Sequence, residues 1–201
     1  MKNTILFALV ITICIISCNK EETKEKEPSP MVIKAVDVEN GYTNIEATVK
    51  AIISGYQNQS DGEFRFISNE ITSTNYVNNG FEITLPAIIP DDYLFPISEE
   101  NEFKSVVVSD VQAKTGKITI DCFHSTGIYM GTFVFMNLAN STNFIYADRS
   151  FTAKGNNSSG VVFDCSFKQG WNIMYLGIGI CTTKPIDFEL KWHFAELNTQ
   201  I

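Results

Sequence analysis

Apolar and polar residues alternate along most of the chain after residue 30. In Phe81-Glu82-Ile83-Thr84-Leu85, every second side chain is apolar, so one face of an extended segment is hydrophobic and the other polar. A period of two is typical of a half-buried β-strand. Related patterns predict about eleven strands, at residues 32–38, 45–51, 64–67, 81–85, 103–108, 117–122, 128–136, 144–151, 161–167, 172–181 and 188–194.

Turn-forming residues separate these predicted strands. The turn signals are Gly41, Gly55, Asp61-Gly62, Asn78-Asn79-Gly80, Gly116, Gly155-Asn156-Asn157 and Gln169-Gly170. Short strands joined by turns, without a convincing helical stripe, predict an all-β fold. We expect an antiparallel β-sandwich, with a barrel as the alternative. The run from Trp171 to Cys181 is almost all apolar, which predicts a central strand covered on both faces.

One long connection interrupts the pattern. Residues 86–102 contain three prolines and five acidic residues. We expect residues 31–201 to form a single all-β domain with a possible seam at 86–102, because the part before the seam is short for a core of its own. Two small β-sandwich halves joined at this seam remain the alternative.

The first residues predict export. Ile5 to Ile16 form an uncharged, apolar run with the length of a signal-peptide core, which is short for a membrane span. Ile15-Ile16-Ser17-Cys18 resembles the lipobox of bacterial lipoproteins. The resemblance implies that residues 1–17 are a signal peptide and that Cys18 carries the lipid. Several acyl chains give a stable membrane anchor.

Residues 18–30 follow as a charged tether. Seven of the eight residues from Lys20 to Glu27 are charged, a composition that favours a solvated, disordered segment. Lys20-Glu21-Glu22 resembles the export signal of Bacteroidetes surface lipoproteins. It implies a location on the outer membrane, exposed to the medium.

Short phrases in the body add two further resemblances. The stretch from Gly80 to Pro86, GFEITLP, resembles a strand ending of transthyretin-like modules. Phrases within residues 146–152, 168–172 and 190–194 resemble Bacteroidetes lipoproteins of uncharacterised function. The second resemblance spans most of the body, and it implies a family but supplies no activity.

Charge narrows the classes of partner. The chain has 15 basic and 23 acidic residues, a formal net charge of −8. An acidic body without a basic, aromatic patch argues against nucleic acid as a partner. It also argues against adsorption to anionic lipid, so the predicted contact with the membrane is the lipid anchor. The sequence leaves the oligomeric state open.

Three cysteines remain after Cys14 leaves with the signal and Cys18 is acylated. Cys122 and Cys165 alternate with apolar residues, so we expect Cys122, Cys165 and Cys181 to be buried. An odd number allows one disulfide at most, and Cys122 with Cys165 is the expected pair. The spacing of Cys and His does not suit zinc, and no cofactor or metal is predicted.

The candidate binding residues are aromatic. Tyr93 and Phe95 lie in the long connection, and Trp171 follows a predicted turn. Exposed aromatic side chains on a rigid sheet suit glycan or peptide ligands. Patterns of nucleophile elbows, zinc proteases and P-loops are missing from the sequence, so no catalytic residue is predicted.

Three functions therefore compete. The preferred one is a non-catalytic surface lipoprotein that binds a glycan or peptide, or serves as an accessory subunit. The alternatives are a hydrolase acting on glycan or peptide, and an adhesion or assembly subunit that pairs strand to strand.

Replacing Cys18 with alanine tests the predicted anchor. The Cys18→Ala variant should leave the membrane fraction for the soluble fraction, because the acyl chains supply the attachment. Fractionation of cells that express the variant or the parent chain measures this. Equal partitioning of both with the membranes would contradict the lipid anchor.

Overall fold

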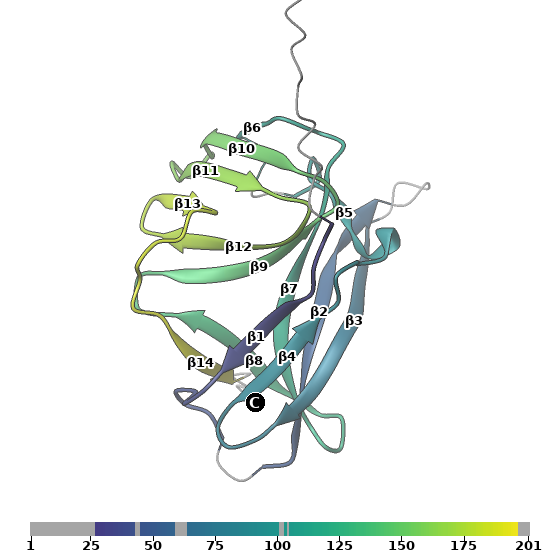
Figure 1. Ribbon diagram of the computed structural model, residues 1–201, viewed down its shortest axis with the longest axis vertical. Coiled ribbons are helices and arrows are strands. Elements are labelled where there is room, and N and C mark those ends of the chain that lie inside the picture. Colours follow the sequence, from purple (N-terminus) through teal and green to yellow (C-terminus); the bar gives the residue numbers. More distant parts are fainter. Residues whose placement is uncertain (1–26, 43–44, 59–63, 101–102, 104, 197–201) are drawn as a thin grey trace, which may run out of the picture.

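The computed structural model describes residues 27–42, 45–58, 64–100, 103 and 105–196 (Figure 1). The predicted all-β class is confirmed, and the 3-10 turn η1 lies between β4 and β5. Within that part, no helix is long and apolar enough to cross a membrane. The elements are β1 (Met31–Ala35), β2 (Ala47–Asn58), β3 (Phe64–Tyr76), β4 (Phe81–Leu85), η1 (Asp91–Tyr93), β5 (Phe95–Pro96), β6 (Val107–Val108), β7 (Lys114–His124), β8 (Tyr129–Met136), β9 (Ser141–Ala147), β10 (Phe151–Asn156), β11 (Val162–Phe167), β12 (Gly170–Gly177), β13 (Ile180–Thr182) and β14 (Lys191–Glu196).

The strands form two open sheets of very different width. A small sheet contains only β1 and β4, paired antiparallel. A twelve-stranded sheet runs in the order β3-β2-β7-β8-β9-β12-β13-β11-β10-β6, with β14 on β8 and β5 on β7. This arrangement is an open β-sandwich, so the barrel alternative is wrong.

The large sheet forks along β7. Residues 115–118 of β7 pair with β9, whereas residues 120–123 pair with β8. One branch therefore continues through β8 to β14, and the other continues from β9 through β12 toward β10 (Figure 1). The small sheet lies in front of the region where the branches separate (Figure 1).

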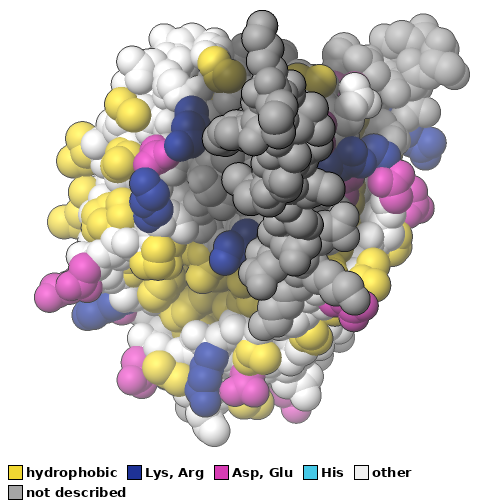
Figure 2. All heavy atoms as spheres, turned by 45° about the horizontal axis from the view of Figure 1, so that its top comes forward, with side chains coloured by type: hydrophobic (Ala, Val, Ile, Leu, Met, Phe, Trp, Pro, Cys, Tyr) yellow, Lys and Arg dark blue, Asp and Glu magenta, His cyan; other side chains and the backbone are white. Residues whose placement is uncertain are grey.

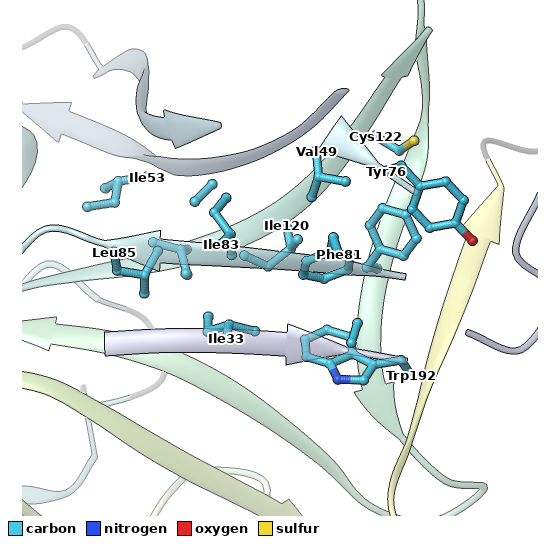
Figure 3. Close-up of a cluster of buried hydrophobic side chains, with 14 of the residues drawn as sticks. Ile33, Val49, Ile53, Tyr76, Phe81, Ile83, Leu85, Ile120, Cys122 and Trp192 are labelled. Atoms are coloured by element: carbon cyan, nitrogen blue, oxygen red, sulfur yellow. The ribbon is translucent and has the colours of Figure 1, made fainter. Parts of the chain in front are cut away.

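A first hydrophobic cluster fills the space between the two sheets (Figure 3). Strand β4 shows the predicted alternation, with its three apolar side chains buried and its two polar side chains exposed. The buried apolar side chains of β4 face apolar residues of β2, β7, β8 and β14. The cluster includes Ile33, Val49, Ile53, Ile83, Leu85, Ile120, Cys122, Phe133, Trp192 and Phe194.

A second cluster lies on the branch that contains β9 to β13. Ile145, Phe163, Cys165, Met174 and Cys181 belong to it. Alternate side chains of β12 point to opposite faces of the sheet. Met174 belongs to the second cluster, whereas its neighbours Ile173 and Tyr175, on the other face, are only half-buried. Both faces of this branch are thus apolar, and the second cluster covers one of them.

The connection at 86–102 joins the two clusters. Its first part contributes Leu94 and Phe95 to the first cluster, and Ile97 belongs to the second. Strand β5 pairs with β7, with Phe95 opposite Thr115. Because Phe95 and Ile97, two residues apart, are buried in different clusters, this connection contacts both of them.

Two glycines expected at turns lie inside strands instead. A Cβ at Gly55 of β2 would come within 2.9 Å of the Phe95 ring, and one at Gly116 of β7 within 2.9 Å of Leu94. Glycine in a strand often permits such a close approach. The turn prediction failed at both positions because the glycine makes room for the connection that packs over it.

Several predicted strands have different limits. The expected strand at 144–151 is interrupted between β9 and β10, and the one at 172–181 is a hairpin of β12 and β13 in which Gly179 has a φ of 72°. The strand predicted at 103–108 shrinks to β6, and the one at 188–194 begins at Lys191. By contrast, β3 extends far beyond 64–67 through polar residues that pair with β2.

Phe95 should be essential for stability. Its side chain is 3% exposed, so Phe95→Ala should lower the free energy of unfolding by about 3–5 kcal/mol. Ile88→Ala is the matched control, because Ile88 lies in the same connection but is 71% exposed, and it should cost about 0.5 kcal/mol or less. Urea unfolding measures both. Equal stability of the two variants would show that Phe95 is not part of the core.

Candidate functional site

A long groove opens beside β1, on the face of β12 that the second cluster does not cover. It consists of three adjoining hollows of about 360, 300 and 400 Å³, all of which touch Met31. Ile173 and Tyr175 line the first two, and Trp171 lines the second and third. We call this the β1–β12 groove. A recess with hydrophobic side chains is visible near the middle of the face in Figure 2.

The floor of the groove comes from the large sheet. Phe144 of β9 and Ile173 and Tyr175 of β12 face it, and each is half-buried. These strands are neighbours, and Ile173 lies opposite Phe144 in the ladder. Alternation aims these side chains away from the second cluster, so the sheet presents a second apolar face to solvent.

Two tryptophans line the groove. The Trp192 indole donates a hydrogen bond of 3.1 Å to the carbonyl of Lys34 in β1. The Trp171 indole donates one of 2.7 Å to the carbonyl of Pro86, directly after β4. Trp192 also lies parallel to Phe144, with 6.2 Å between the ring centroids. Each indole is thus fixed by the small sheet that forms the opposite wall.

Strand β1 forms that wall with its unpaired edge. Met31, Ile33 and Ala35 lie opposite Leu85, Ile83 and Phe81 of β4, and within the described part of the chain β1 has no second strand partner.

Two contacts set the direction of its backbone groups. The backbone N–H and C=O of Gly80 both bond to Val77. Successive residues of a strand point these groups to opposite sides, so the N–H and C=O of Phe81 point toward β1. The Lys34 carbonyl bonds Trp192 and therefore points away from β4. By alternation, the N–H and C=O of Val32 and the N–H of Lys34 point outward from β4, along the edge that lines the groove.

Charges at the groove are few and mainly positive. Of the described residues that line it, Lys34, Lys168 and Glu27 are charged. Lys34 is 3.4 Å from Glu82, in an exposed ion pair. The backbone at Lys168 is fixed, since the buried amide of Asn172 accepts from its N–H at 3.0 Å and donates to its carbonyl at 2.8 Å.

The three predicted binding residues have different locations. Trp171 lines the groove and is half-buried. Phe95 is buried in the first cluster, which removes it from the surface available to a ligand, and Tyr93 packs half-buried against that cluster. The predicted lipidation site Cys18 and the export signal Lys20, Glu21 and Glu22 lie outside the described residues.

Sequence reasoning missed the groove floor and the β1 edge. The useful signal was the apolar run after Trp171, which we interpreted as a strand covered on both faces. The strand does have two apolar faces, but one of them is the open groove. Which strand would lack a neighbour depends on long-range pairing, and the pattern within a strand does not encode this.

The cysteines confirm one expectation and correct another. Cys122, Cys165 and Cys181 are fully buried, as predicted. The expected Cys122–Cys165 pair is wrong, because the two lie in different clusters and the Cys165 sulfur lies 3.7 Å from that of Cys181. Burial and the nearby Asp121 raise the pKa of the Cys122 thiol to about 11.

Asp121 is the described carboxyl whose pKa is raised. The described residues contain no group of three or more His, Cys, Asp or Glu side chains that could hold a metal ion. Burial raises the pKa of the Asp121 carboxyl, but Thr132 and Thr119 already donate hydrogen bonds to it. Asp121 is not among the residues that line the groove.

Comparison with known proteins adds no relative. No family model, curated protein or solved structure matches the chain. The β1–β12 groove and the unpaired edge of β1 are therefore the features on which a functional argument rests.

Proposed function

We propose that this protein is a non-catalytic, lipid-anchored binding protein of the outer-membrane surface that captures an extended peptide in the β1–β12 groove. Cys18 would hold it to the membrane and the charged tether would separate the folded body from the bilayer. The observation that carries the binding proposal is the unpaired edge of β1 beside an apolar face of the large sheet.

Strand addition to β1 explains why both features occur together. A peptide strand beside β1 would receive main-chain hydrogen bonds from Val32 and Lys34. It would lie over β9 and β12, since these strands form the groove floor. Every second side chain of the peptide would then point toward Phe144, Ile173 and Tyr175. The ligand class is therefore an extended segment with apolar residues at alternating positions.

The polar groups of the groove favour a peptide over a glycan. The Asn172 amide is bonded to the backbone at Lys168 and Gly170, and the Thr183 hydroxyl is bonded to the backbone of Ser166. The outward N–H and C=O groups of β1 lie along this groove, and such groups recognise another backbone. Lys34 and Lys168 favour a peptide that also contains carboxylates.

A hydrolase receives less support from this site. Glycoside hydrolysis needs two carboxyl groups about 5–10 Å apart. Among the described residues that line the groove, only Glu27 is acidic. The groove offers hydrolysis no such pair.

Assembly through strand pairing is the second candidate. Strand β3 ends the large sheet, is thirteen residues long and has β2 as its strand neighbour. Its exposed Arg65 and Glu70 place charges along the strand, and charge on an edge strand discourages pairing between sheets. The edge of β1 has an apolar floor beside it and is therefore the better docking position.

Replacing Val32 with proline tests strand addition directly. Proline removes the outward N–H of Val32, while the hydrogen bonds to β4 come from its neighbours. Peptides of about seven residues, long enough to pair along β1, would be selected from a random display library on the wild-type chain. Val32→Pro should weaken the selected peptides at least about tenfold, or about 1.4 kcal/mol, in fluorescence anisotropy.

Matched variants separate backbone pairing from other effects. Val32→Ala keeps the N–H and should bind nearly as the wild type does. Ile173→Lys should abolish binding because it places a charge on the groove floor, whereas Ile178→Lys, at a site 85% exposed, should not. Circular dichroism would verify that each variant is folded. Selected peptides that bind Val32→Pro and Ile173→Lys as tightly as wild type, or a library that yields no binder, would refute the proposal.

A further inference from the structure

Two buried thiols lie next to each other in the second cluster. The sulfur atoms of Cys165 and Cys181 are 3.7 Å apart, and the Cys165 thiol is also 3.4 Å from the carbonyl of Cys181. Both residues are 0% exposed. Neither belongs to the β1–β12 groove, so this pair is independent of the proposed peptide site.

The strand pairing explains why the two side chains meet. Cys165 lies on β11 and Cys181 on β13, which run parallel with Phe163 opposite Cys181. Cys165 follows Phe163 by two residues and so points to the same face of the sheet. The two cysteines are therefore diagonal neighbours on one face. A disulfide bond is about 2.0 Å long, so a modest side-chain rotation by each residue would bring the sulfurs to bonding distance.

We infer that Cys165 and Cys181 form a disulfide bond in the mature protein, with a small-molecule or protein disulfide as the oxidant. One cysteine thiolate attacks the oxidant and releases one of its sulfurs as a thiol. The second thiolate then attacks the mixed disulfide, so the sulfur–sulfur bond of the cysteines forms and a second thiol leaves. The two cysteines lose two protons and two electrons, and the oxidant becomes two thiols.

The third cysteine differs in ways that keep it out of this bond. Cys122 belongs to the first cluster, on the other side of the connection at 86–102. The hydrogen bond from Cys181 lowers the pKa of the Cys165 thiol against the opposing effect of burial, whereas burial raises the pKa of Cys122. Cys122 therefore serves as an internal control with the same chemistry and no thiol neighbour in its cluster.

Burial decides when the bond forms. An oxidant cannot reach either sulfur in the closed fold, so the disulfide forms while the strands assemble or open locally. The disulfide bond would join β11 to the three-residue strand β13. Strand β13 lies between β12 and β11 in the large sheet. The oxidising conditions outside the cytoplasm, where the chain is expected, favour such a bond.

Peptide mapping of the full chain tests this inference. The protein would be unfolded, refolded with reduced and oxidised glutathione, alkylated in denaturant and digested with trypsin. Trypsin cleaves after lysine and arginine except before proline, so Lys184-Pro185 stays intact. Cys122 then falls in residues 118–149, Cys165 in 155–168 and Cys181 in 169–191, while Cys14 and Cys18 fall in 3–20. We expect a peptide pair that joins 155–168 to 169–191, and an alkylated Cys122.

Unfolding supplies a second readout. Dithiothreitol should lower the urea midpoint of the wild type and of Cys122→Ala, because the bond closes a loop between residues 16 apart. It should not change the midpoint of the Cys165→Ala/Cys181→Ala double variant. Alkylation of both Cys165 and Cys181 in the oxidised, refolded wild type would overturn the inference, as would a bridge that contains Cys122.

Discussion

Burial of the alternate apolar side chains of β1 and β4 in the first cluster holds the small sheet against the large one, and two indole hydrogen bonds fix its position. A two-stranded sheet is marginally stable by itself, so β1 and β4 need the large sheet. Trp192 on β14 binds the carbonyl of Lys34, and Trp171 on β12 binds that of Pro86. Both acceptors are backbone atoms, so the bonds fix the path of the small sheet whatever side chains it exposes. Each tryptophan comes from a different branch of the forked sheet.

The unequal width of the two sheets creates the groove. The small sheet covers the first cluster and ends at β1, while the large sheet continues through β9 and β12. Apolar side chains on this continuation form the groove floor, because no described strand lies over them. The second cluster supports these strands from behind. A groove held between two packed clusters is preformed, which would reduce the entropy lost on binding the extended ligand that we propose.

The sequence predicted the class of the fold well and its long-range arrangement poorly. Alternation identified β4 within its limits, because its register is set by one buried face. Glycine misled the turn prediction at Gly55 and Gly116, where it permits contact with Phe95 and Leu94. The pairing of β1 with β4, across about fifty residues, has no local signal. The candidate site was therefore only partly predictable: Trp171 was found, and the β1 edge was not.

The free edge of β1 is the central claim, and site-resolved amide hydrogen exchange of the unliganded protein by NMR tests it most directly. The amides of Ile33 and Ala35 bond to β4 and should exchange slowly. The amides of Val32 and Lys34 point outward, so the account predicts that they exchange much faster than their neighbours. Equal protection of all four amides would mean that another segment already pairs with this edge, and it would contradict the account.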